Sequence, residues 1–249
     1  MEQTVRCIWE HNGADTLLHL EEHPGAYARG ASLDEAAEKI SVELFAYLRW
    51  RGVRCETAPE ARPVIVQEVR SALCIRDADS GALFDSERTP LTMEEYSRLS
   101  ALAMRSAHDF QALYDAIPSK RISALPQRMC FYGPAPRTAQ QMYAHVRDVN
   151  AYFFDRIGAA ADNAGSIADC RARGFAALEK QKEFLKNGVY TDGYGEQWTL
   201  RKLCRRFVFH DRIHARAMTR MAAATFGPGS ARDVFFFSLL EGQGKADRP

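Results

Sequence analysis

Residues 198–218 read WTLRKLCRRFVFHDRIHARAM, and this stretch decides the fold of the larger part of the chain. Thr199 is a residue type that favours helix N-caps, and Gly227-Pro228-Gly229 would end a helix that begins there. Between them, one seam repeats at alternating spacings of three and four, as core-facing helix positions do. The seam consists of Leu203, Phe207, His210, His214, Ala217 and Met221. The pattern predicts a long helix whose inward face carries two histidines.

Three further helices are expected between residue 91 and this stretch. Thr92 with Glu95, and Thr138 with Gln141, have the spacing of capping boxes, and Ser166 is a third N-cap candidate. The predicted helices run over 92–117, 138–158 and 166–187. Four long helices joined by polar loops predict an all-α four-helix bundle over residues 91–249.

The hydrophobic period is different in residues 1–90. Two alternating runs flank the turn-forming residues 11–15, which is typical of a β-hairpin, and Ser32 begins a stretch with helical spacing. The expected elements are strands at 4–10, 16–21 and 26–30, a helix over 32–50 and a strand over 63–73. This order predicts an α+β N-terminal domain that ends near Pro90.

Composition excludes several classes of protein. The chain of 249 residues is 46% hydrophobic and 26% charged, as globular proteins are. Its longest strongly apolar run, 234–240, is too short to cross a bilayer, and residues 1–15 lack an export signal. The six cysteines form no C-x-x-C pair, so we expect reduced thiols. From the short apolar run and the missing export signal we expect no membrane partner and a cytoplasmic location. The run Phe235 to Phe237 suggests packing of the tail or a subunit contact.

Charge is divided unevenly between the two parts. Residues 1–90 hold 10 basic and 16 acidic groups, whereas 91–249 hold 23 and 16. Seven of the basic groups lie on the last predicted helix: Arg201, Lys202, Arg205, Arg206, Arg212, Arg216 and Arg220. They could attract an anionic substrate, or form a solvated or salt-bridged face. Nucleic-acid binding is not favoured, because no reader motif accompanies them.

Three histidines form a candidate metal site. His210 and His214 lie one turn apart on one helix face, where they can chelate a single ion. His145 occupies the inward stripe of helix 138–158. Three buried imidazoles are costly without partners, whereas three histidines and one open position are the pattern of catalytic zinc. The alternative is that all three histidines are packing residues. The other histidines, His108 on the helix 92–117 and His11, His19 and His23 in the first unit, are expected to be exposed.

A protease reading of the same stretch is disfavoured. Asp211 makes the string HDRIH, one methylene short of the H-E-x-x-H motif, and it lies about 100° around the helix from His210. Metal-dependent hydrolysis by another route stays open.

Two resemblances follow from these motifs. TAQQMYAHVRDVNAYFF (138–154) together with the stretch at 198–218 resembles the DinB-like (DinB/YfiT) metal-binding four-helix bundles over about residues 91–228. LEEHPGAYARGASLDEAAEKI (20–40) is similar to HicB-like domains, which implies a scaffold or partner-binding role for residues 1–90. The DinB-like resemblance implies that His145, His210 and His214 bind a divalent metal, zinc or nickel.

The DinB-like resemblance also implies a function. Several members of that family are transferases that use a low-molecular-weight thiol, so we expect a metal-dependent thiol transferase with a small-molecule substrate and no assigned catalytic residue. A metal-dependent hydrolase and a non-catalytic binding protein are the alternatives. A homo-oligomer is possible on this sequence.

Overall fold

The computed structural model describes residues 3–77, 79–130 and 133–241. The chain divides into two compact units, Met1–Ala82 with Asp233–Pro249, and Leu83–Arg232. A small mixed sheet in the first unit is followed by a helical region in the second, so the predicted α+β layout is confirmed at this level.

The first unit is built on a four-stranded sheet with the order β3-β2-β1-β4. Its strands are β1 (Gln3–His11), β2 (Thr16–Leu20), β3 (Tyr27–Gly30) and β4 (Ala61–Arg70). The first three pair antiparallel, with Trp9 opposite Leu18, whereas β4 runs parallel to β1. A parallel partner requires a crossover, and the helices between β3 and β4 supply it. All three predicted N-terminal strands are confirmed, as is the hairpin.

The crossover contains two helices rather than the single predicted helix over 32–50. They are α1 (Leu33–Glu38), which Ser32 caps, and α2 (Ile40–Trp50). The break falls at Lys39, whose backbone N–H donates to the carbonyl of Ala36, three residues back. Its ammonium group also donates to the carbonyl of Arg29 in β3. The backbone bond closes a tighter turn than an α-helix has, and both helices pack against the sheet.

A buried polar cluster in the first unit corrects the prediction that its histidines are exposed. His19 is only 2% exposed and Glu10 is fully buried. His19 Nε2 lies 3.0 Å from Glu10 Oε2, to which Ser80 Oγ also donates, and the N–H of Gly81 donates to Glu10 Oε1. The His11 side chain is largely buried too, beside Glu68. Side chains alternate between the two faces of a strand, and one face of this sheet is buried. The hydrogen bond of each buried polar group to a neighbour offsets the cost of removing it from water.

We expect Glu10→Gln to change the acid stability of the protein. Burial alone would raise the pKa of Glu10, but hydrogen bonds from His19, Ser80 and Gly81 lower it from 4.5 to about 2. A lowered pKa stabilises the folded state above about pH 4.5, and this contribution of about 3 kcal/mol is lost as the pH falls towards 2. Thermal melts between pH 7 and pH 2 should therefore show a lower midpoint for the variant at pH 7 and a flatter acid limb.

Glu68→Gln is the matched control, because it removes a carboxylate that is paired with a histidine but is half-exposed. Its effect should be much smaller. Equal losses for the two variants would contradict the role given to burial of Glu10.

The second unit contains four long helices. They are α3 (Met93–Ala116), α4 (Ala139–Asp155), α5 (Ile167–Leu178) and α6 (Leu200–Phe226). The predicted N-caps are confirmed, because each cap side chain accepts a backbone N–H from the first turn; they are Thr92, Thr138, Ser166 and Thr199. The third helix ends at Leu178 rather than near 187, since Glu183 and Asn187 adopt left-handed backbone conformations that a helix does not contain.

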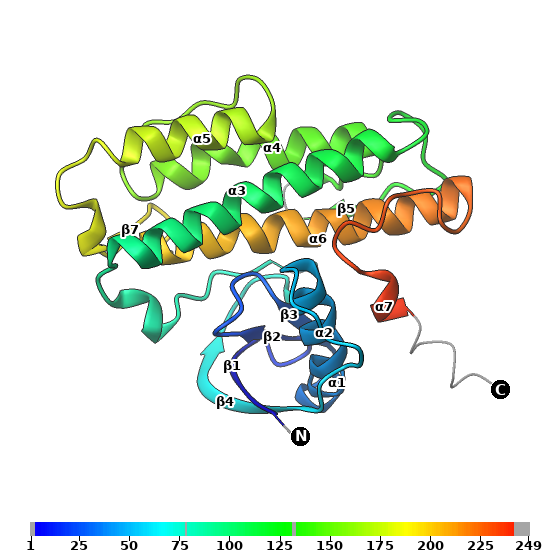
Figure 1. The fold of residues 1–249 in the computed structure, drawn as a ribbon, viewed down its shortest axis with the longest axis horizontal. Helices are drawn as coiled ribbons and strands as arrows, with labels where there is room; N and C mark the ends of the chain where they lie inside the picture. The colour runs from blue at the N-terminus through cyan, green and yellow to red at the C-terminus, as the bar shows by residue number, and fades with distance from the viewer. Residues whose placement is uncertain (1–2, 78, 131–132, 242–249) are drawn as a thin grey trace. The chain divides into compact units, whose positions relative to one another are not determined.

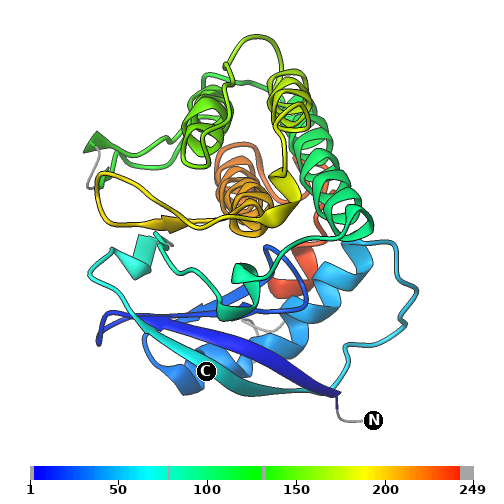
Figure 2. The same cartoon turned by 90° about the vertical axis from the view of Figure 1, so that its left-hand side faces the viewer.

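These helices lie alongside one another. Helix α3 contacts α5 and α6, and α4 also contacts α5 and α6 (Figures 1 and 2). Rings of Phe154, Phe175 and Phe207 meet between them at centroid distances of 5.2 to 6.1 Å. Gly174 permits the close approach of α4 and α5, because a Cβ atom there would lie 2.1 Å from the ring of Phe154. The shared aromatic core holds α4 and α6 at a fixed spacing.

Short elements complete both units. They are the 3₁₀ turns Ile75–Asp77, Asp85–Arg88 and Phe184–Lys186, the strand pairs β5 (Met129–Cys130) with β6 (Gly133–Pro134) and β7 (Tyr190–Thr191) with β8 (Gln197–Trp198), and helix α7 (Ser238–Glu241). None of the helices in the described ranges is long and apolar enough to cross a membrane. All six cysteines are free.

The C-terminal tail belongs to the first unit, which differs from its assignment to residues 91–249. Phe235 and Phe237 are buried and stack on each other, and Phe235 also contacts the ring of Trp50 at 5.5 Å. Helix α7 contacts α2. The unit boundary likewise falls at Leu83 rather than near Pro90, since Glu87 is paired with Arg205 of α6. Of the two roles suggested for the Phe235 to Phe237 run, tail packing is therefore the observed one.

Candidate metal centre

Helices α4 and α6 bring three histidines together. One ring nitrogen from each of His145, His210 and His214 lies within 4.8 Å of the others. His210 Nε2 is 3.2 Å from His145 Nε2, and the ring centroids of the three pairs are 4.4 to 5.0 Å apart. These are the three histidines predicted as one site, and the packing of α4 on α6 brings His145 to His210 and His214.

The surroundings keep these imidazoles neutral. Burial lowers the pKa of His145, against the opposing charge of Asp148. Burial and, next, the neighbouring His145 lower the pKa of His214 to about 3. The pKa of His210 lies well below 6.5 because of burial and then the other two histidines. A neutral imidazole has a free lone pair, which is the form that binds a metal ion.

The donor set fits a divalent cation. Two nitrogen ligands of a tetrahedral zinc ion lie about 3.3 Å apart, close to the 3.2 Å separation of the two Nε2 atoms. His210 Nδ1 is buried without a hydrogen-bond partner in the described part of the chain. All three side chains are half-buried. Among the described residues the group holds three histidines and no carboxylate, which leaves a fourth tetrahedral position for another ligand.

Asp211 is directed away from this centre, as its position on the helix predicted. Its carboxylate is fully buried and accepts two hydrogen bonds from Arg171 of α5, at 2.7 and 3.0 Å, and another from Ser106 of α3. The guanidinium of Arg171 also stacks on Phe207, 4.1 Å from the ring centroid. A carboxylate engaged in this way cannot act as the base for a water at the histidines.

Sequence reasoning missed Arg171 and Ser106. The available signal was Asp211 itself, because an acidic residue next to two inward-facing ligands needs a buried partner. Which arginine supplies that partner depends on how α5 packs against α6.

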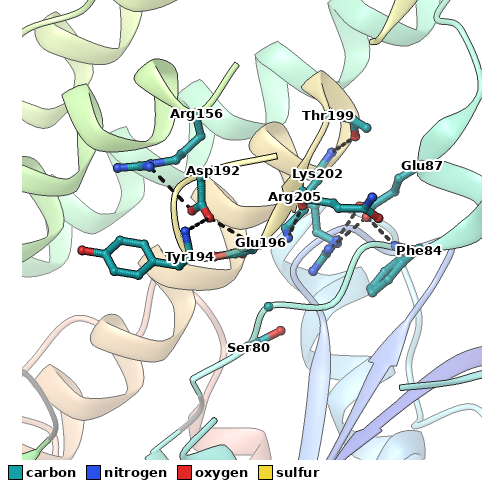
Figure 3. Close-up of polar contacts among 12 residues, drawn as sticks. Ser80, Phe84, Glu87, Arg156, Asp192, Tyr194, Glu196, Thr199, Lys202 and Arg205 are labelled. Atoms are coloured by element: carbon teal, nitrogen blue, oxygen red, sulfur yellow. Dashed lines mark hydrogen bonds and ion pairs between the residues drawn. The ribbon is translucent and has the colours of Figure 1, made fainter. Parts of the chain in front are cut away.

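The basic residues of α6 are largely structural. Lys202 Nζ lies 2.8 Å from Glu196 Oε1 and donates to the carbonyl of Gln197, and Arg205 pairs with Glu87 at 2.5 and 3.0 Å (Figure 3). Burial lowers the pKa of Lys202 to about 8, although Glu196 opposes it. For these groups, the salt-bridged alternative of the sequence analysis is the correct one.

Two more of the seven basic residues of α6 are buried or hydrogen-bonded. Arg201 donates to the carbonyls of Thr89 and Pro90 and to Glu95, and Arg212 is fully buried.

His108 is exposed on α3, as predicted. A cavity of about 270 Å³ lies elsewhere in this unit, against Leu178, Phe184 and Tyr190, and none of the three histidines lines it.

Comparisons of the chain with protein-family models, with curated proteins and with solved structures found no match. The geometry of the three histidines is therefore the observation from which a function can be argued.

Proposed function

We propose that the helices α3 to α6 are a DinB-like four-helix bundle that binds zinc or nickel through His145, His210 and His214 and transfers a low-molecular-weight thiol to an electrophile. The observation that carries this proposal is the meeting of three neutral imidazole nitrogens from two helices, two of them 3.2 Å apart. The first unit, HicB-like in our reading, would act as a scaffold or bind a partner.

Neutral ligands support the thiol chemistry. When bound, a divalent zinc or nickel ion lowers the pKa of a coordinated thiol and so supplies a nucleophilic sulfur at neutral pH. Three imidazoles without a carboxylate leave the positive charge of the cation undiminished.

Thiol transfer is favoured over hydrolysis because of Asp211. Hydrolysis needs a base that takes a proton from water, and the carboxylate nearest the ligands in sequence is committed to Arg171 and Ser106. Transfer needs no such base once the thiol has ionised. A non-catalytic metal-binding protein is the third possibility, which the activity assay distinguishes.

The test is conjugation of a thiol to an aryl halide by the zinc- or nickel-loaded protein. The thiol sulfur forms a bond to the ring carbon, halide leaves, and the thiol proton is released to the buffer. We expect conjugate to accumulate with at least one member of a panel of small thiols, and to return to the uncatalysed rate with His214→Ala.

Two results would contradict this function. Metal-dependent turnover of esters or amides without a thiol would favour the hydrolase. Full metal occupancy with no turnover of either kind would favour a binding protein.

A further inference from the structure

The cavity of about 270 Å³ in the second unit lies where α4 and α5 end and α6 begins. Leu178 is the last residue of α5, Leu200 is the first of α6, and Ile157 closely follows the end of α4. Here the chain passes from α5 towards β7 (Figure 1). Along α6, His210 lies about 15 Å beyond Leu200 at the helical rise per residue. The cavity is therefore separate from the metal centre, and the proposed function does not use it.

The lining of this cavity has an apolar interior. Its three aliphatic side chains, those of Ile157, Leu178 and Leu200, are each only 2 to 3% exposed. The rings of Phe184 and Tyr190 also line it. An apolar cavity of about 150 Å³ holds a benzene molecule. A cavity of about 270 Å³ therefore has room for an apolar body of roughly ten non-hydrogen atoms.

The loop that contributes to the lining is held in a fixed conformation. Glu183 and Asn187 adopt left-handed backbone angles, with φ of 63° and 56°. Asn187 is 2% exposed, and its side-chain amide donates to the carbonyls of Glu87 and Thr89, both at 2.7 Å. Residues in such conformations persist where the surrounding structure holds them, and they cluster at ligand sites. The cavity is therefore formed before any ligand binds, as small-molecule sites usually are.

The charged groups at the cavity favour an anion. Its lining includes two lysines and one glutamate, and the glutamate, Glu183, pairs with Lys186 at 2.7 Å. Within residues 3–77, 79–130 and 133–241, no ion pair or side-chain hydrogen bond engages the exposed ammonium group of Lys182. The amide of Gln181, by contrast, donates to the carbonyl of Gly158. One positive charge beside an apolar interior suits an apolar molecule that carries a single carboxylate.

We propose that this cavity binds a small apolar carboxylic acid in its ionised form, with the apolar body against Ile157, Leu178 and Leu200 and the carboxylate at Lys182. Burial of the apolar body supplies most of the affinity, because each buried methylene group contributes about fourfold. The ion pair with Lys182 is exposed and contributes less. Its role is to select the acid over a neutral molecule of the same shape.

The experiment compares octanoate with octanamide, which has the same length and no charge, by isothermal titration calorimetry on the full chain. We expect the wild type to bind both compounds, and octanoate about fivefold more tightly, which is the scale of one exposed ion pair. Lys182→Gln should remove this preference and leave the affinity for octanamide unchanged. Lys180→Gln is the matched control, because Lys180 is also exposed but does not line the cavity.

A second variant tests the position of the apolar body. Gly188 lines the cavity, and a Cβ atom there would lie 3.7 Å from the ring of Tyr190, which is an ordinary contact. Gly188→Leu should therefore fold, and it should weaken binding of both compounds at least tenfold by filling the space that they occupy. His214→Ala should bind octanoate as the wild type does, because the metal centre is a separate site.

Failure of the wild type to bind either compound, or unchanged binding by Gly188→Leu, would overturn the cavity as a ligand site. Equal affinities of the wild type for octanoate and octanamide, or a preference that survives Lys182→Gln, would overturn the selection of an anion by Lys182. Loss of octanoate binding in His214→Ala would place the carboxylate at the histidines instead of the cavity. None of these results depends on whether the metal centre is catalytic.

Discussion

Zinc affinity should fall by about 100-fold or more when His145, His210 or His214 is replaced by alanine. Loss of a residue that only orients a ligand costs about 10- to 100-fold in affinity, so loss of a ligand itself should cost at least as much. The three nitrogens lie within 4.8 Å of one another. Each variant removes one of these three donors and leaves two. Competition with a chromophoric chelator gives the dissociation constants, and elemental analysis of purified protein gives the occupancy.

His108→Ala is the matched control for this series. His108 is exposed on α3 and lies outside the ligand group, so its loss should leave zinc affinity unchanged. Removal of this exposed imidazole should leave folding intact, which circular dichroism checks. If all four variants bound zinc as the wild type does, the three histidines would be packing residues and not ligands.

Arg171→Met should destabilise the protein by about 3–5 kcal/mol. The change leaves the fully buried carboxylate of Asp211 without the guanidinium that donates two hydrogen bonds to it, and an unpaired buried charge is among the costliest defects in a folded protein. Urea unfolding followed by circular dichroism measures the loss. The double variant Arg171→Met with Asp211→Leu removes both charges, so it should recover much of the stability.

Arg173→Met is the control, two residues further along α5. Arg173 also pairs with an aspartate, Asp162, but both side chains are about half exposed. Exposed pairs contribute about 0–1 kcal/mol, so this variant should unfold close to the wild type. Equal destabilisation by Arg171→Met and Arg173→Met would mean that burial of the Arg171–Asp211 pair has no energetic consequence.

The Arg171 pair also bears on the metal centre. Asp211 follows His210 directly, and its bonds to α5 and α3 fix the rotation of α6 at the point where both of its histidines project. The helix register that presents His210 and His214 to α4 therefore depends on a polar contact on another face of the helix.

Features that depend on residues close together in the chain could be predicted from the sequence alone. The four N-caps, the starts of the long helices and the hairpin of β1 and β2 depend on residues within a few positions of one another, so spacing and residue type sufficed to predict them. The same holds for His210 and His214, which share a face because a helix repeats every 3.6 residues. The identification of the helical region as a DinB-like bundle stays a prediction.

Contacts between distant residues were decided by the tertiary structure. The helix pattern indicated that His145 faces inward, but how close it comes to His210, 65 positions away, depends on packing. Nothing local shows that Arg171 pairs with Asp211, or that His19 is buried with Glu10. The return of Phe235 to Trp50 is of the same kind. Such contacts depend on how side-chain volumes fit when helices and strands pack, and each replaces water around a polar or aromatic group by a partner from elsewhere in the chain. Sequence periodicity says which face of an element is buried, whereas only packing decides what that face meets.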